Sequence, residues 1–226
     1  MICFANSWKI GGRCVAGREI ERNVIGPRWL RPVSARPSEE VNDVERMRSD
    51  GVEPNVLDVL DISFIRPNPH GWQQENHIID GSVRWAYKGK GDWSHAIGCV
   101  DGPVGPLWWN GDSSYNGLND RVPALRASLS TRSLYLLRTS DLVLHRGLEG
   151  PPDRQKIAVR AHFTFGGEEY RIKVTDPVVA DELDTDGEFP FSDAVLCVSL
   201  AEPFGGYAYK LVAAVITASR ANGGPL

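Results

Sequence analysis

Residues 156–175, KIAVRAHFTFGGEEYRIKVT, predict a β-hairpin with one apolar face and one basic face. Apolar and polar side chains alternate along both runs, as in half-buried strands, and the pair Gly166-Gly167 between them is a tight-turn signal. A turn of two residues places Phe165 opposite Glu168. The same register sets like charges opposite each other across the strands, Arg160 with Lys173 and His162 with Arg171.

Like charges that face each other across two strands destabilise a sheet by up to about 1 kcal/mol per pair. An anion bound to the exposed face removes this cost, so the hairpin predicts a site for phosphates. The alternative is a solvated strand face on which Lys and Arg only prevent edge aggregation. The expected exposed cluster consists of Arg160, His162, Arg171 and Lys173.

The charge of the chain limits how it can bind a polyanion. The 226 residues are 42% hydrophobic and carry a net charge of −4, so one large or two small domains can form, but bulk attraction to nucleic acid is excluded. The charge is segregated: residues 1–36 contain seven Lys and Arg against two Glu, whereas residues 176–193 contain seven Asp and Glu and no cation. The acidic stretch 181–188 predicts a solvated loop, with a regulatory acidic flap near the basic face as the alternative.

The four cysteines, Cys3, Cys14, Cys99 and Cys197, are scattered and include no Cys-x-x-Cys pair. We expect free thiols and a cytoplasmic location, because neither a secretory leader nor an apolar run of about 18–20 residues is visible. His95 and Cys99 are spaced to share one helix face, but two ligands without a second pair are weak evidence for a metal. No metal site and no cofactor are therefore predicted.

Strand-like runs separated by turn-rich stretches predict an all-β protein with a few short helices. The expected strands are 1–5, 13–18, 29–33, 56–66, 77–87, 133–144, the two strands of the hairpin, 194–199 and 207–217. The expected helices are 38–47, 93–100 and 120–128. Five strands in each half favour two OB-like five-stranded barrels in tandem, residues 1–115 and 116–226, over an immunoglobulin-like sandwich. The connection between them is expected to bury Trp108 or Trp109.

Three segments resemble the signature of bacterial dual OB-fold domain proteins. They are ANSWKIGGRCVAG at residues 5–17, WLRPVS at 29–34 and LCVSLAEPF at 196–204, which YKLVAAVI at 209–216 continues. The resemblance spans nearly the whole chain. It implies two OB folds and a role in nucleic-acid recognition, often in bacterial conflict or defence loci.

Two N-terminal segments combine aromatic rings with cations. In the first, Trp8, Lys9 and Arg13 flank the pair Gly11-Gly12, whose backbone can approach a phosphate while the indole stacks on a base, a contact worth about 1–3 kcal/mol. A simple turn is the alternative. In the second, Trp29 and Arg31 share one strand face, which suits base stacking but equally fits a buried Trp beside surface Arg.

The sequence as a whole predicts a non-catalytic protein that binds single-stranded or distorted DNA or RNA. No hydrolase, phosphate-loop or metalloprotease motif is present, and no catalytic residue is predicted. Two alternatives remain open. One is a protein-interaction subunit of a larger assembly, and the other is a small nucleotide-acting enzyme with Cys14 or Asp176 in its cleft.

Overall fold

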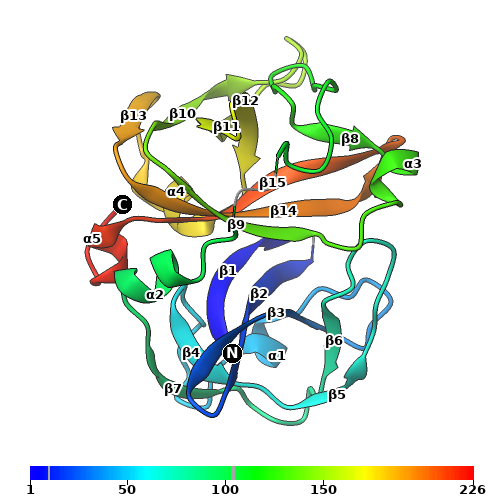
Figure 1. Ribbon diagram of the computed structural model, residues 1–226, viewed down its shortest axis with the longest axis vertical. Coiled ribbons are helices and arrows are strands. Elements are labelled where there is room, and N and C mark those ends of the chain that lie inside the picture. Colours follow the sequence, from blue (N-terminus) through cyan, green and yellow to red (C-terminus); the bar gives the residue numbers. More distant parts are fainter. Residues whose placement is uncertain (10, 103–104) are drawn as a thin grey trace.

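The computed structural model describes residues 1–9, 11–102 and 105–226, which form two β-sheets stacked one above the other (Figure 1). The lower sheet has seven strands: β1 (Ile2–Lys9), β2 (Gly12–Glu21), β3 (Val24–Val33), β4 (Asp58–Asp61), β5 (Phe64–Pro67), β6 (Asn76–Ile79) and β7 (Ala86–Lys90). The upper sheet has eight: β8 (Arg121–Pro123), β9 (Leu134–Thr139), β10 (Leu142–Glu149), β11 (Lys156–Phe165), β12 (Glu168–Val174), β13 (Gly187–Phe191), β14 (Ala194–Phe204) and β15 (Tyr207–Ile216). The predicted mainly β fold is confirmed.

Both sheets repeat one topology. In the lower sheet, β1, β2 and β3 form an antiparallel meander, β3 runs parallel to β6, and β6 pairs with β5. In the upper sheet, β10, β11 and β12 form the meander, β12 runs parallel to β15, and β15 pairs with β14. A short helix follows the third meander strand each time, α1 (Asp43–Arg46) and α4 (Pro177–Glu182). The two halves thus share a fold without a visible sequence repeat.

The number of strands exceeds the predicted five per half because three expected strands are divided. The run 56–66 becomes β4, which pairs with β1, and β5, which pairs with β6. The run 133–144 is interrupted at Ser140 and Asp141 into β9, which pairs with β14, and β10, which pairs with β11. The run 77–87 is separated into β6 and β7, and the edge strands β8 and β13 were not expected at all. In neither half do the described strands close into a hydrogen-bonded ring.

The hairpin of β11 and β12 has the predicted register. Phe165 lies opposite Glu168, so Gly166 and Gly167 form the turn. Arg160 lies opposite Lys173, and His162 opposite Arg171. The alternation of the sequence was sufficient to predict this local pairing.

The two sheets share a hydrophobic core at the level where β1 meets β15 in Figure 1. Ile2 and Phe4 from β1 pack with Leu136 from β9 and Ala214 from β15. In the connection between the halves, Trp108 is buried as predicted, and its Nε1 donates a 2.7 Å hydrogen bond to the backbone oxygen of Arg132. This shared core places the ends of β1 and β2 beside β14 and β15.

The helices are short. The expected helix near 93–100 is α2 (Trp93–Gly98), and the regions 38–47 and 120–128 contribute only α1 and α3 (Ala124–Ala127). The remaining helices, α4 and α5 (Ala218–Ala221), follow β12 and β15. Within the described ranges, no helix has the length and apolar character that crossing a membrane requires.

Candidate nucleic-acid interface

A cleft of about 170 Å³ lies where the two sheets meet, and we call it the junction cleft. The lower sheet contributes the ends of β1 and β2 and part of β3, and the upper sheet contributes β14, β15 and the residue after β12. By the roughly 10–15 Å³ that one water needs, the volume exceeds that of a few solvent molecules and accommodates a planar ring. The lining residues that carry chemistry are Ser7, Trp8, Lys9, Arg13, Cys14, Arg31, Glu39, Glu40, Gln73, Thr175, Ser199 and Glu202.

Trp8 and Arg13 form the rim of the junction cleft. They lie opposite each other on β1 and β2, and the Arg13 guanidinium is 5.7 Å from the centre of the Trp8 ring. The backbone N–H of Trp8 donates to the Thr175 oxygen at 2.9 Å, which fixes the end of β1 against the upper sheet. Trp8 nevertheless remains 51% exposed. An exposed aromatic face therefore lies beside a cation that is itself largely buried.

Two partial ion pairs leave positive charge available at this rim. Arg13 Nη2 lies 4.0 Å from Glu53, while its Nη1 has no hydrogen-bond partner among the described residues. Lys9 Nζ is 2.9 Å from Glu202 Oε1, in a half-buried pair that joins β1 to β14. The Lys9–Glu202 pair is solvent-accessible and contributes only about 0–1 kcal/mol, so a phosphate can replace its carboxylate partner. The Arg13 side chain is largely buried, and its unpartnered Nη1 has no accessible surface.

The Gly11-Gly12 turn has a structural role that the sequence did not reveal. A Cβ atom at position 11 would lie 2.9 Å from Glu40 Oε1, and one at position 12 would lie 2.5 Å from the Val41 oxygen. The turn is thus packed against Glu40 and Val41, and Gly11 also has a positive φ of 88°. The predicted phosphate cradle at these glycines is therefore wrong, because a carboxylate occupies the approach. Ile10 of the same motif lies outside the described residues.

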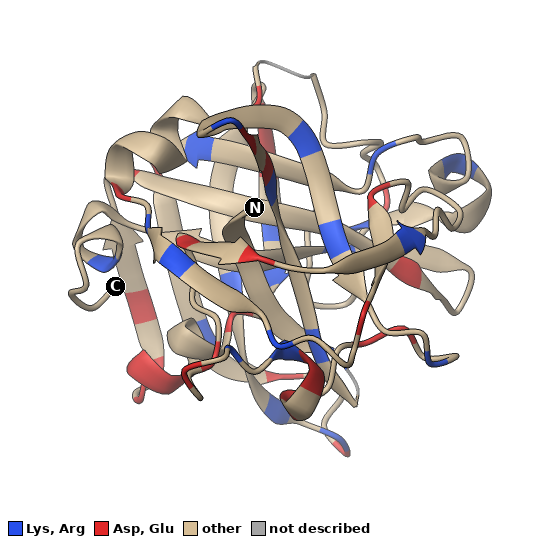
Figure 2. Ribbon diagram, turned by 90° about the horizontal axis from the view of Figure 1, so that it is seen from below, with Lys and Arg blue, Asp and Glu red and all other residues tan. Residues whose placement is uncertain are grey.

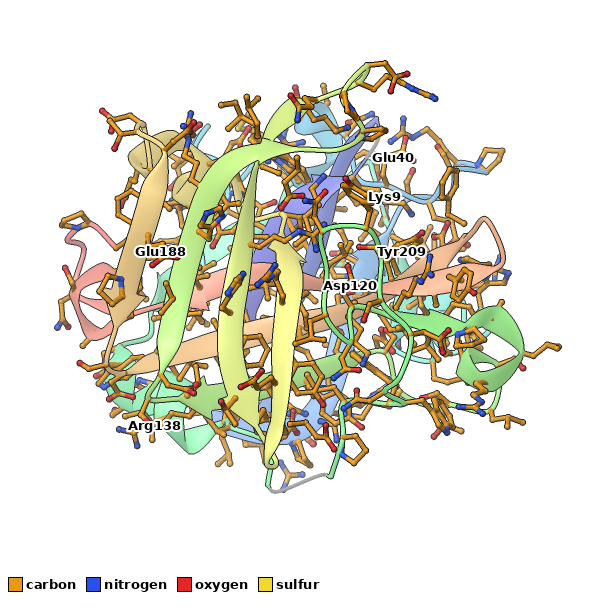
Figure 3. All side chains as sticks on the ribbon, turned by 90° about the horizontal axis from the view of Figure 1, so that it is seen from above. Lys9, Glu40, Asp120, Arg138, Glu188 and Tyr209 are labelled. Carbon is orange, nitrogen blue, oxygen red and sulfur yellow. The ribbon has the colours of Figure 1, made fainter. Side chains whose placement is uncertain are left out.

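Glu40 is the most unusual group in the junction cleft. It is only 5% exposed, and its Oε2 has no hydrogen-bond partner in the described part of the chain. A hydrogen bond from the Ser38 side chain, with nearby Arg36 and Lys9, holds the pKa of Glu40 below its ordinary value despite burial. Figure 3 shows the labelled Lys9 and Glu40 beside each other at the same edge of the molecule. The cleft therefore contains an ionised acceptor close to a cation.

Trp29 and Arg31 are less accessible than base stacking requires. Trp29 is buried, with the Arg18 guanidinium 4.2 Å from its ring centre, so its face is already covered. Arg31 is also buried; its Nη2 lies 2.8 Å from Glu75 and donates to Ser133 Oγ at 2.7 Å. The prediction of an exposed Trp29–Arg31 face is wrong, because both side chains pair with partners distant in sequence. Arg31 still reaches the wall of the junction cleft.

The expected exposed cluster on the hairpin is also only partly formed. Arg160 is 7% exposed, with Nη1 at 3.0 Å from Asp120 and Nε hydrogen-bonded to Glu149 at 2.5 Å. These two carboxylates neutralise the charge that an anion was expected to neutralise. Arg160 is therefore a structural ion-pair residue, and the prediction of its exposure is wrong.

The other three residues of the predicted cluster remain near the surface. Arg171 is exposed, while burial and nearby Arg171 and His145 lower the pKa of His162. Burial and the neighbouring Lys156 lower the pKa of Lys173. His145 on β10 lies opposite Glu188 on β13, so the acidic stretch does border this face (Figure 3).

The basic N-terminal segment does not form a continuous positive surface. Figure 2 shows Lys and Arg interspersed with Asp and Glu along the strands and loops. Three cations of residues 1–36 pair with acids elsewhere in the chain, Arg18 with Asp101, Arg31 with Glu75 and Arg36 with Glu45, and Arg28 pairs with Glu19 within the segment. Local geometry, rather than regional charge, therefore determines where an anion can bind.

The residues considered for catalysis or metal binding have other partners. Asp176 caps α4 and forms a buried ion pair with Arg220, while Cys14 lines the junction cleft and accepts a 3.6 Å contact from Arg31 Nη1. His95 and Asp92 form the capping box of α2. Among residues 1–9, 11–102 and 105–226, no group of three or more His, Cys, Asp or Glu is arranged to hold a metal ion.

The junction cleft brings together Trp8, Lys9, Arg13 and Arg31, but not the hairpin residues. Sequence reasoning missed Glu40, Gln73 and Ser199, since no periodic pattern links position 40 or 73 to the end of β1. Glu202 lies within the LCVSLAEPF segment, and the family resemblance of that segment was the one sequence feature that pointed to this residue.

A comparison with protein families agrees with the repeated topology. Neither the curated proteins nor the solved structures contain a match to this chain. The family model described as dual OB-containing domain matches residues 1–215, which is nearly the whole chain and includes both sheets. The protein therefore belongs to the dual OB-containing domain family.

Proposed function

We propose that this protein binds single-stranded nucleic acid in the junction cleft. The supporting observation is the half-exposed Trp8 ring, which stands at the rim of a cleft with the largely buried, incompletely paired Arg13 beside it. An indole offers a stacking platform for any base, and an adjacent guanidinium neutralises the backbone phosphate. OB folds use strand faces and neighbouring loops in this way.

A single strand suits this geometry better than a duplex. Stacking on Trp8 requires a base that is free of its neighbours, and bases in a duplex are stacked on each other. The net charge of −4 also leaves little bulk attraction for a duplex. Binding is therefore proposed to depend on a few local contacts and to be moderately sensitive to salt.

The test uses fluorescence anisotropy with labelled single-stranded DNA and RNA of about 30 nucleotides, which spans two OB-type sites of up to roughly 16 nucleotides each. Removing the stacking platform with Trp8→Ala is expected to weaken binding by roughly fivefold or more, since one stacked base contributes about 1–3 kcal/mol. Tyr115→Ala is the control, because Tyr115 is an exposed aromatic outside the cleft. Absence of binding by the parent protein at low salt would remove the proposal.

A second function, docking of a protein partner, is favoured by a separate surface. Leu125 and Leu129, on and just after α3, are 86% and 75% exposed, and Phe204 at the end of β14 is 77% exposed. The Ala124 N–H donates to the Gly206 oxygen at 2.9 Å, so α3 adjoins the β14–β15 turn. Exposed apolar side chains gathered in this way are typical of interaction sites. Leu125→Asp should abolish capture of such a partner without affecting the anisotropy assay.

A further inference from the structure

A second hollow, of about 450 Å³, lies where the two halves of the chain meet, and we call it the arginine pocket. The lower sheet contributes Arg18 from β2, Arg28 from β3 and His77 from β6. Arg132, in the segment before β9, and Asp101, in the connection between the halves, complete this part of the lining. The pocket therefore gathers three guanidinium groups from positions far apart in the sequence.

Asp101 is shared between two of these cations. Its Oδ1 lies 2.7 Å from Arg18 Nη2 and also contacts Arg132 Nη2. Its Oδ2 accepts a hydrogen bond from the Leu136 backbone N–H at 2.8 Å, which fixes the carboxylate against β9. One carboxylate thus faces two guanidinium groups, and one positive charge is left without a counterion.

The other acids at the arginine pocket already have partners. Glu75 forms an ion pair at 2.8 Å with Arg31, which lines the junction cleft. Glu19 lies 3.3 Å from Arg28 in an exposed pair, and such pairs contribute little to stability. Arg28 also donates from Nη2 to His77 Nε2 at 2.9 Å, which holds the guanidinium at the pocket wall. Among the described residues that line the pocket, no acid is left for the surplus charge.

The surplus charge can be reached from solvent. The Arg132 side chain is 33% exposed and that of Arg28 is 56% exposed, whereas Arg18 is buried. Arg132 is held in place because its Nε donates to the Leu134 oxygen at 2.8 Å and its guanidinium lies 4.2 Å from the centre of the Tyr135 ring. Its Nη1 makes no hydrogen bond within the described residues and is not among the polar atoms that the fold hides from solvent. An anion can therefore contact a fixed guanidinium without displacing a carboxylate.

A phosphate group suits this arrangement. Guanidinium groups match phosphate oxygens in both charge and hydrogen-bond geometry. Thr131, which is exposed in the same lining, adds a hydroxyl donor. The pocket thus offers two accessible cations and one neutral donor to a single anionic group.

The arginine pocket adjoins the junction cleft. Gln73 lines the cleft and Gln74 lines the pocket, so the two hollows lie on either side of one short segment. On β2, Arg13 belongs to the cleft and Arg18 to the pocket, and five residues correspond to about 17 Å at the usual rise of a strand. A strand of about 30 nucleotides extends roughly 100 Å even at the 3.4 Å rise of a duplex, so it reaches both hollows.

We propose that Arg28 and Arg132 of the arginine pocket bind a phosphate of the same single strand whose base stacks on Trp8. This inference rests on the proposed function and extends the binding surface from the junction cleft across the boundary between the two halves. The surplus positive charge beside Asp101 is the observation that carries it.

The experiment measures the affinity of a labelled single strand of about 30 nucleotides by fluorescence anisotropy, at salt concentrations between about 50 and 200 mM. The variant that carries both Arg28→Gln and Arg132→Gln is expected to reduce the slope of log K against log salt by about 0.7, the contribution of one phosphate. Its affinity at about 50 mM salt should fall roughly eightfold, which is what this slope amounts to between 50 mM and 1 M salt.

Arg138→Gln is the matched control. Arg138 lies on β9, six residues or about 20 Å beyond Arg132, and forms an exposed ion pair with Asp193 at 2.8 Å. Figure 3 shows Arg138 well away from Lys9 of the junction cleft. This variant should keep the parent affinity and slope. An equal loss in Arg138→Gln would overturn the inference, because the effect would then come from net charge and not from the pocket.

The outcomes distinguish the arginine pocket from the junction cleft. Unchanged affinity and slope in the double arginine variant, together with weakening by Trp8→Ala, would overturn the inference and leave the proposed function intact. Weakening by the double arginine variant without any effect of Trp8→Ala would overturn the junction cleft and leave the arginine pocket as a contact for nucleic acid. No binding by the parent protein would overturn both.

Two further measurements keep the inference testable. If the double variant does not fold, as judged by circular dichroism, Arg28→Gln alone replaces it, because the Arg28 side chain and its ion pair with Glu19 are exposed. Unchanged affinity in Arg28→Gln would then overturn the inference. Inorganic phosphate at millimolar concentration and constant ionic strength separates two sources of the anionic group. The strand should stay bound in its presence, and its release would overturn a strand as the ligand of the pocket.

Discussion

The Arg13 guanidinium lies 5.7 Å from the centre of the Trp8 ring, on the neighbouring strand of the same hairpin. A cation and an exposed aromatic ring are therefore held together by the pairing of β1 with β2. The backbone bond from Trp8 to Thr175 then fixes both against the other sheet. The pairing of these strands therefore places the positive charge of Arg13 next to the ring on which a base would stack.

Arg13 is expected to contribute one phosphate contact. Replacing Arg13 with Gln should weaken binding to single strands and flatten the plot of log K against log salt by about 0.7, the contribution of one neutralised phosphate. Titrations between about 50 and 200 mM salt measure the slope. Arg154→Gln is the control, because Arg154 is highly exposed and lies outside the cleft. Equal slopes for the parent and Arg13→Gln would show that Arg13 does not contact phosphate.

Arg160 is expected to stabilise the fold rather than bind a ligand. Arg160→Gln leaves Asp120 and Glu149 without their buried cation, and removal of one partner from such a network costs about 3–5 kcal/mol. Urea unfolding should show this loss in the free energy of unfolding. Arg171→Gln, at the exposed position two residues before Lys173, should change it by less than about 0.5 kcal/mol. Similar stabilities of the two variants would contradict the structural role of Arg160.

Lys210 should make stability depend on pH. Burial lowers its pKa to about 7, and its Nζ donates to the Trp109 oxygen and Asn110 Oδ1 at 2.8 and 2.9 Å. Between about pH 7 and the ordinary lysine value near 10.4, the unfolded chain binds the proton and the folded chain does not. Stability attributable to Lys210 must therefore rise with pH in this window.

Urea unfolding of the parent protein and of Lys210→Met at several pH values on both sides of about pH 7, extending toward the ordinary lysine pKa, isolates this effect. The difference in unfolding free energy should shift in favour of the parent as pH rises, and should level off below about pH 7, where both states are protonated. A difference that is constant from neutral to alkaline pH would show that Lys210 keeps an ordinary pKa.

The thiols should differ in reactivity. Burial raises the pKa of Cys3 to about 12 and also raises that of Cys197, so neither thiolate is accessible in the folded protein. Cys14 is half-buried and lines the junction cleft. Alkylation with iodoacetamide followed by intact-mass and peptide analysis should label Cys14 first and Cys3 and Cys197 only after unfolding. Early labelling of Cys3 would contradict the buried environment.

The alternation of the sequence determined the local structure of this protein. The hairpin register followed from Gly166-Gly167, since side chains alternate between faces and a short turn permits one pairing. The burial of Trp108 and the position of α2 were also predictable, as was the OB-type architecture from the resemblance of segments at both ends. The division of 133–144 into β9 and β10 was missed, although the polar residues 138–141 interrupt the apolar run at the point where the strand changes its partner.

Only the tertiary structure decided which charged side chains remain available to contact a ligand. The sequence grouped Arg160 with His162, Arg171 and Lys173, but Asp120 and Glu149 come from outside the hairpin and neutralise it. The sequence also gave no reason to place Glu40 against the Gly11-Gly12 turn, where it becomes the unpartnered acceptor of the junction cleft. Such pairings join positions far apart in the chain, so no local period encodes them. Burial maintains these pairings, because a buried charge that loses its partner destabilises the folded protein.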